Sequence, residues 1–110
     1  MIDIEKVKLD IVKRLKPLNP EKIILFGSYA YGTPNANSDI DLYVVTKDEF
    51  IPQNFREKMS IISKISNAID DIREDNAVDL LVHTKMMADK FKALDSSFSR
   101  DLLTRGIVLL

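Results

Sequence analysis

The sequence contains no cysteine and no tryptophan, and it has only three glycines and one histidine. Without cysteine the protein forms neither disulfides nor thiolate–metal bonds, and nothing ties it to an oxidising compartment. No stretch approaches the length of a membrane-spanning helix, and the first ten residues, MIDIEKVKLD, lack the apolar core of a signal peptide. These absences predict a cytoplasmic protein without a membrane partner.

The chain also lacks an excess of either charge. Sixteen basic and seventeen acidic residues give a net charge of −1, so the protein has no overall positive field to hold DNA or RNA. We therefore regard nucleic acid as an unlikely partner. The apolar fraction of 45% and the length of 110 residues predict one globular domain over residues 1–110.

Hydrophobic spacing predicts alternating helices and strands, and hence an α/β (α+β) fold. Apolar residues recur every three or four positions in four segments, whereas four others are continuously apolar or alternate with polar residues. The segment 27–38 is rich in Gly, Ser, Asn and Pro, which predicts a loop with at most one helical turn. The predicted helices are 4–15, 55–72, 85–94 and 96–105, and the predicted strands are 22–26, 39–46, 78–83 and a short edge strand at 107–110.

Two acids begin the second predicted strand. Asp39 and Asp41 are separated by one residue, so both carboxylates project from the same face, about 6.5 to 7 Å apart along the backbone. Carboxylates at this spacing suit Mg²⁺, which prefers hard oxygen ligands and shares its other positions with water and phosphates. The Asp-x-Asp pattern alone is weak, because twelve Asp residues in 110 make roughly one such pair by chance. Its position directly after a loop favours a cation site over a solvated strand edge.

Gly27 and Ser28 follow the first predicted strand directly. Glycine allows the backbone to approach a phosphate closely, and the following N–H groups and the serine hydroxyl are donors for an anion. A Gly-Ser pair alone is usually an ordinary turn. Together with two acids on the next strand, it indicates half of a site for Mg²⁺ and a triphosphate.

The stretch GSYAYGTPNANSDIDLYVV resembles the signature of the DNA polymerase β-type nucleotidyltransferases, in their minimal (MNT) form. The shared pattern is Gly-Ser, about ten residues, and Asp-x-Asp leading into an apolar strand. The flanking strand, the long helix and the late Asp79 extend the likeness over nearly the whole chain. The resemblance implies a nucleotidyltransferase-like mixed sheet of three to four strands packed against helices.

The resemblance also implies roles for five residues. Asp39 and Asp41 would hold two Mg²⁺ ions. Gly27 and Ser28 would bind the β- and γ-phosphates of ATP, the nucleotide donor. Asp79 would be the third carboxylate, acting either as a metal ligand or as the base that orients the acceptor hydroxyl. An acid that only makes a hydrogen bond at a strand end is the alternative for Asp79.

One position departs from the family pattern. Many relatives carry Arg where this chain has Tyr31, in a Gly-Ser-x-Ala-Arg-Gly sequence. A cation near the phosphates is thereby lost, which indicates either weaker nucleotide binding or a degenerate enzyme. The Asp residues of the pattern are intact.

The resemblance further implies a protein partner, because stand-alone MNT proteins pair with HEPN-domain proteins in toxin–antitoxin modules. Similar proteins act as antitoxins by transferring AMP to a tyrosine of the HEPN toxin, and this is the function we expect. An antitoxin that neutralises its partner by binding alone is one alternative, favoured by Tyr31. A nucleotidyltransferase that modifies a small molecule is the other, although 110 residues leave little room for an acceptor pocket.

Several other polar residues near the motif permit more than one interpretation. Ser38 either caps the loop or contacts a phosphate. His83, the only histidine, lies on the same predicted strand face as Asp79, but a polar strand end explains it more simply than catalysis. Tyr29, Tyr31 and Tyr43 flank the predicted site, and any of them could stack on a base or accept a nucleotide.

Overall fold

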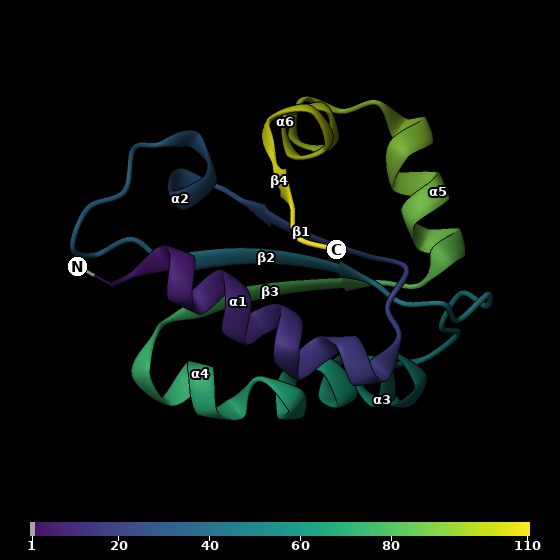
Figure 1. Ribbon diagram of the computed structural model, residues 1–110. Coiled ribbons are helices and arrows are strands. Elements are labelled where there is room, and N and C mark those ends of the chain that lie inside the picture. Colours follow the sequence, from purple (N-terminus) through teal and green to yellow (C-terminus); the bar gives the residue numbers. More distant parts are fainter. Residues whose placement is uncertain (1) are drawn as a thin grey trace.

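A mixed four-stranded sheet lies at the centre of the structure, a computed structural model that describes residues 2–110 (Figure 1). Its strands are β1 (Lys22–Phe26), β2 (Ile40–Val45), β3 (Val78–His83) and β4 (Ile107–Val108), in the order β3-β2-β1-β4. β1 runs antiparallel to both β2 and β4, whereas β2 and β3 are parallel. The predicted mixed sheet of three to four strands is confirmed.

The strands alternate between two faces, as their sequences predict. Ile40, Leu42 and Val44 of β2 are buried on one face, and Tyr43 and Val45 are buried on the other. Two predicted strands are longer than the strands in the structure. β2 begins after Asp39 and ends before residue 46, and the predicted strand 107–110 shortens to two residues.

Three helices cover the first face of the sheet, as Figure 1 shows: α1 (Ile4–Leu15), α3 (Phe55–Ala68) and α4 (Asp70–Asp75). α1 begins at Asp3, whose carboxylate accepts a hydrogen bond from the Lys6 backbone N–H (3.3 Å). Its apolar residues follow helical spacing and are buried against the sheet: Val7, Ile11 and Leu15.

The single helix predicted over 55–72 is wrong, because the chain breaks at Ile69. Ile69 adopts φ −111° and ψ 19°, so α3 ends there and α4 starts in a new direction. The break allows Ile69 to be completely buried in the core. The predicted apolar stripe is wrong at its start as well, since Phe55 is 77% exposed and Met59 is 37% exposed. The buried residues of this segment are Ile61, Ile65, Ile69 and Ile72.

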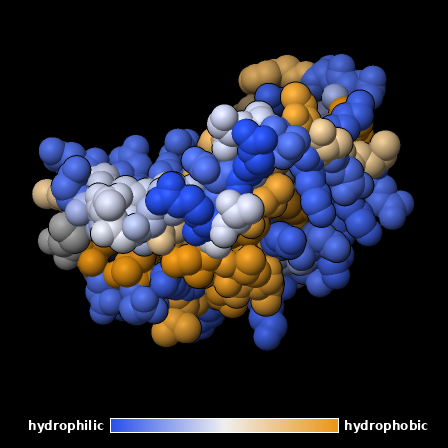
Figure 2. Space-filling model, turned by 90° about the horizontal axis from the view of Figure 1, so that it is seen from above, coloured by the Kyte–Doolittle hydropathy of each residue, from blue (hydrophilic) through white to orange (hydrophobic). Residues whose placement is uncertain are grey.

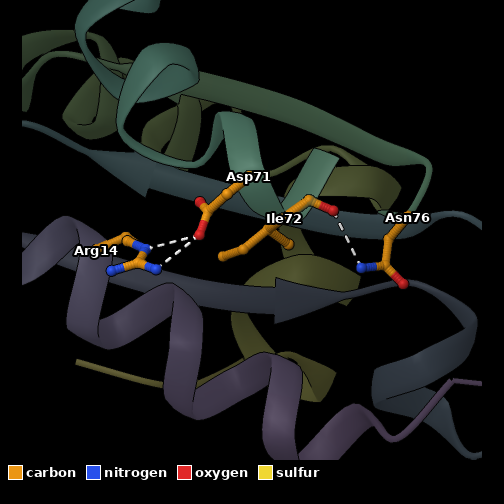
Figure 3. Close-up of polar contacts among 4 residues, drawn as sticks. All are labelled: Arg14, Asp71, Ile72 and Asn76. Carbon is orange, nitrogen blue, oxygen red and sulfur yellow. Dashed lines mark hydrogen bonds and ion pairs between the residues drawn. The ribbon is translucent and has the colours of Figure 1, made fainter. Parts of the chain in front are cut away.

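α4 is joined to α1 by an ion pair and closed by a side-chain cap (Figure 3). The Arg14 guanidinium donates from Nε (3.0 Å) and Nη2 (2.7 Å) to Oδ2 of Asp71. This hydrogen bond lowers the pKa of Asp71 below its usual value. At the other end of α4, the Asn76 side-chain amide donates to the Ile72 carbonyl (3.0 Å), which satisfies a terminal acceptor before β3 begins.

On the opposite face lie α5 (Lys85–Leu94) and α6 (Ser97–Arg105), near the positions that the sequence predicts. A short helix, α2 (Ser28–Tyr31), stands beside the end of β1. α5 and α6 are attached to the sheet by an aromatic cluster with ring centroids 5.1 to 5.8 Å apart. Its members are Phe26, Tyr43, His83, Phe91 and Phe98. Across the described residues, no helix is long and apolar enough to span a bilayer.

Candidate active site

Asp41 and Asp79 lie side by side on the sheet. β2 and β3 are parallel, and their register pairs Asp41 directly with Asp79. Neighbouring strands lie about 4.7 to 4.9 Å apart, and residues in register project from the same face. The topology therefore brings together two acids that are far apart in the sequence.

This end of the sheet face is open. α5 and α6 cover the other end, where Tyr43 and Val45 are buried, whereas Asp41 is half-buried and Asp79 is exposed. Asp39 is also exposed and comes directly before β2, two residues before Asp41. Figure 2 views the molecule from this side and shows hydrophilic surface over much of it, interrupted by apolar patches.

Of the three acids, Asp41 has a pKa raised by its surroundings. Burial raises the pKa of Asp41 above its usual value, and the nearby charges of Asp79 and then Asp39 raise it further. The ion pairs found among residues 2–110 involve other acids, namely Glu5, Asp71 and Asp95. The three site acids therefore form a concentration of negative charge without a basic side chain to neutralise it.

Gly27 forms a tight corner between β1 and α2. Its φ of +74° belongs to the region that favours glycine, and a Cβ atom at this position would overlap the Oδ2 atom of Asp41. The Gly27 carbonyl accepts hydrogen bonds from the backbone N–H groups of Ala30 (3.0 Å) and Tyr31 (2.9 Å). The Asp41 carboxylate thus lies directly against the Gly27–Ser28 corner, so the two halves of the predicted motif are adjacent in space.

The acids alone do not form a complete metal-binding site. Among residues 2–110, no group of three or more His, Cys, Asp or Glu side chains is arranged to hold a metal ion by itself. Mg²⁺ is commonly held by one or two carboxylates together with water and substrate phosphates, so an open pair of acids still fits this ion. The donor set of Asp39, Asp41 and Asp79, all oxygen and all unneutralised, suits a hard cation that arrives with a triphosphate.

The loop before β2 is ordered by its own side chains and borders a hollow of about 520 Å³. The Asn35 backbone N–H donates to the Ser38 hydroxyl (2.9 Å), so Ser38 has the loop-capping role that was one of its two predicted roles. The hollow is lined by residues from this loop, from α2 and from the turn before β3, including Tyr29, Asp39 and Asn76.

Tyr43 is unavailable as a nucleotide-stacking or acceptor residue, contrary to one of the alternatives raised by the sequence. It is 1% exposed, and its hydroxyl lies 2.8 Å from Nδ1 of His83. Burial raises the pKa of Tyr43 and lowers the pKa of His83, the latter with a further contribution from Lys58. A neutral His83 ring then shares a structural hydrogen bond with the Tyr43 hydroxyl, which agrees with the simpler of its two interpretations.

Sequence reasoning missed one charged residue beside the site. Arg105, the last residue of α6, places its guanidinium carbon 3.9 Å from the centroid of the Tyr31 ring. Tyr31 is three residues after Ser28, in α2. No local pattern marks Arg105, because its position depends on how α6 packs against β1 in three dimensions.

Comparison with known families agrees with this geometry. Residues 9–109 match the family model described as polymerase beta, nucleotidyltransferase. The search of curated proteins found no significant match.

Solved structures with the same fold include a toxin–antitoxin crystallised with AMP-PNP, with 27% sequence identity and a TM-score of 0.56. That match covers 94% of this chain and 72% of the other. A mutant MntA–HpeT toxin–antitoxin gives 23% identity and a TM-score of 0.54, covering 94% and 71% of the two chains. A candidate nucleotidyltransferase from Sulfolobus solfataricus has 21% sequence identity and a TM-score of 0.55, and the match covers 96% of this chain and 77% of the other. At these identities the last two are similar to this chain in fold alone.

Proposed function

Because this chain belongs to the polymerase β nucleotidyltransferase family, we propose that it is a Mg²⁺-dependent nucleotidyltransferase that acts as an antitoxin. In this proposal it transfers AMP from ATP to a tyrosine hydroxyl of a HEPN-domain toxin, in the cytoplasm. The observation that carries the proposal is the pairing of Asp41 with Asp79 on an open sheet face, against the Gly27 corner.

The metal-binding residues in this proposal are Asp39, Asp41 and Asp79. Burial and, after it, the charges of Asp79 and Asp39 raise the pKa of Asp41, and a bound cation would relieve both effects. Bound Mg²⁺ would neutralise charge on the phosphates and polarise the oxygens that react. Asp79 is exposed, so an incoming acceptor can reach it, and it serves either as a ligand or as the base.

Gly27 and Ser28 are the phosphate-binding residues. The Ser28 and Tyr29 N–H groups precede the first backbone hydrogen bonds of α2, and the glycine corner lets an anion reach them closely. The Ser28 hydroxyl adds a further donor beside the Asp41 carboxylate. Donors for the triphosphate and acceptors for its cation therefore meet at one corner of the sheet.

The reaction is an in-line displacement at the α-phosphorus of ATP. The acceptor oxygen bonds to that phosphorus, the bond to the bridging oxygen breaks, and pyrophosphate leaves while the hydroxyl proton passes to a base. The chain contributes mainly position and charge, as in other phosphoryl transfers. The open face leaves the acceptor side of the site uncovered, which suits an acceptor carried by another protein.

The antitoxin role is supported by two independent likenesses. The motif resembles that of MNT antitoxins, and the chain shares 27% identity and the fold with a protein from a toxin–antitoxin crystallised with AMP-PNP. We extend to this chain the partner class that the resemblance implies, a HEPN-domain protein.

A binding-only antitoxin is the second candidate, and the presence of Tyr31 in place of the family Arg is the observation that favours it. Incubation with α-labelled ATP, Mg²⁺ and the protein encoded by the neighbouring gene separates the two functions. The enzyme predicts label on the partner, and its loss in an Asp39→Ala, Asp41→Ala double variant. If the double variant still silences the partner and no label appears with the wild type, the binding-only function is correct.

An Asp48→Asn variant is the matched control for this experiment. Asp48 is exposed and lies beyond the opposite end of β2, so its substitution removes one negative charge of the same kind without altering the site. We expect labelling by this variant to equal that of the wild type.

A further inference from the structure

Arg105 and Tyr31 form a contact between two elements that flank the end of β1. The Arg105 guanidinium carbon lies 3.9 Å from the centre of the Tyr31 ring, in a cation–π arrangement. Arg105 is the last residue of α6, and Tyr31 is the last residue of α2. Figure 1 shows both helices on the same side of the sheet, on either side of the end of β1.

Arg105 lies beside the short helix that begins at the Gly27 corner. The Tyr31 ring that it contacts belongs to the last residue of α2, and the Tyr31 backbone N–H donates to the Gly27 carbonyl (2.9 Å). β4, which begins two residues after Arg105, pairs with β1 through Leu25–Ile107 and Ile24–Val108. The turn at Gly106 is tight, because a Cβ atom there would collide with the Leu102 carbonyl and with Ile24. The junction between α6 and β4 is thereby fixed against β1.

Opposite charges therefore lie on the two sides of this corner. On the β2 side, Phe26 pairs with Asp41, whose carboxylate contacts Gly27. On the β4 side stands the guanidinium of Arg105. A metal-bound triphosphate needs both kinds of group, carboxylates for the cation and a donor for the phosphate oxygens.

Arg105 is also available to a ligand. Arg14 and Arg100 are each paired with a carboxylate, whereas the ion pairs within the described part of the chain do not include Arg105. Its side chain is exposed, and stacking on Tyr31 occupies one face of the guanidinium but leaves the in-plane N–H donors free. The ring thus restricts the orientation of the cation without neutralising it.

We propose that Arg105 is a phosphate-binding residue of this site, held in place by Tyr31, and that it donates hydrogen bonds to the terminal phosphates of the nucleoside triphosphate. Tyr31 is its positioning residue. This inference rests on the proposed function, and it explains the departure at residue 31: the cation that relatives carry in α2 is supplied here by α6.

Calorimetric titration with a non-hydrolysable ATP analogue and Mg²⁺ tests the role of Arg105. We expect Arg105→Ala to weaken binding of the analogue about tenfold or more, because a charge-assisted hydrogen bond to phosphate is lost. Binding of AMP, which lacks the terminal phosphates, should change less than about twofold. Arg100→Ala removes the same charge from the same helix, so it is the matched control and should bind the analogue as the wild type does.

The role of Tyr31 is tested by substitution and by rescue. Tyr31→Phe keeps the ring and should retain binding, whereas Tyr31→Ala should weaken binding of the analogue but not of AMP. Introducing Tyr31→Arg into the Arg105→Ala variant returns a cation to α2 and should recover most of the lost affinity. A purely structural role for the contact would instead lower the melting temperature and reduce AMP and analogue binding equally.

The outcomes separate this inference from the proposed function. If the wild type binds the analogue with Mg²⁺ but Arg105→Ala binds it within twofold of the wild type, the role of Arg105 is wrong and the nucleotidyltransferase proposal stands. An equal loss of AMP and analogue binding also overturns the role of Arg105. If the wild type fails to bind the analogue, both proposals fall together.

Discussion

At the scale of single residues, the candidate site depends on the absence of a side chain at Gly27. The Asp41 carboxylate occupies the space where a Cβ atom would lie, and the positive φ of Gly27 turns the chain sharply from β1 into α2. Gly32, at the end of α2, also has a positive φ, but a Cβ atom there would meet nothing within 4 Å. Substitutions at the two glycines can therefore distinguish the cost of backbone strain from the cost of steric overlap.

Substitution of Gly27 by Ala should disrupt both the fold and the site. We expect a loss of about 1 to 3 kcal/mol in the free energy of unfolding from strain and overlap, together with displacement of Asp41 and weaker Mg–nucleotide binding. Gly32→Ala should show only the strain, about 1 kcal/mol, and normal nucleotide binding. Urea unfolding and calorimetry measure the two effects. Equal behaviour of the two variants would show that the Gly27 corner has no special role.

The residue scale also shows where sequence reasoning succeeds and where it ends. Gly27, Ser28, Asp39 and Asp41 are found from a local pattern, because the two neighbouring strands that carry them pair antiparallel and place Asp41 beside Gly27. Asp79 is found only through a resemblance, since its approach to Asp41 depends on the parallel pairing of β2 with β3. Arg105 carries no local signal, because a stacked guanidinium requires the packing of α6 to be known.

At the scale of elements, hydrophobic periodicity identifies the helices and strands but not their breaks. The segment 55–72 keeps a continuous three- and four-residue spacing, and nothing in it resembles a helix stop such as Gly or Pro. The chain nevertheless breaks at Ile69, whose backbone leaves the helical region while its side chain and that of Ile72 are buried in the core. Tertiary burial overrides local helix propensity here.

The packing of β2, β3 and α5 leads to a second prediction, which concerns how the stability of the fold depends on pH. The hydrogen bond between Tyr43 and His83 is buried under Phe91, and burial lowers the pKa of His83 in the folded state. Between the unfolded pKa of about 6.5 and the lower folded pKa, the unfolded chain binds more protons than the folded chain. The contribution of His83 to stability is thus complete above about pH 6.5 and declines as the pH falls through this window.

Urea unfolding at a series of pH values tests whether stability declines as the pH falls, with His83→Asn as the comparison. Asn keeps a polar side chain near the Tyr43 hydroxyl but does not titrate, so the decline below about pH 6.5 should become shallower in the variant. If both proteins lose stability along the same slope, the folded state does not depress the pKa of His83.

At the scale of the whole molecule, the helices are distributed unequally over the two faces of the sheet. One face is covered along its length by α1, α3 and α4, whereas α5 and α6 cover only part of the other (Figure 1). The acids stand at the uncovered end, beside α2 and the end of α6. The sequence predicts the fold class and the position of the motif, but the extent of this coverage depends on the aromatic cluster that attaches α5 and α6 to the sheet.

Calorimetry of ATP-analogue binding with and without Mg²⁺ shows whether the open acids hold Mg²⁺ together with a triphosphate. We predict uptake that requires Mg²⁺ and falls at least tenfold in both Asp41→Asn and Asp79→Asn, with Asp48→Asn unchanged. Binding of equal strength in the presence of a chelator, or in the Asp41→Asn protein, would contradict the account.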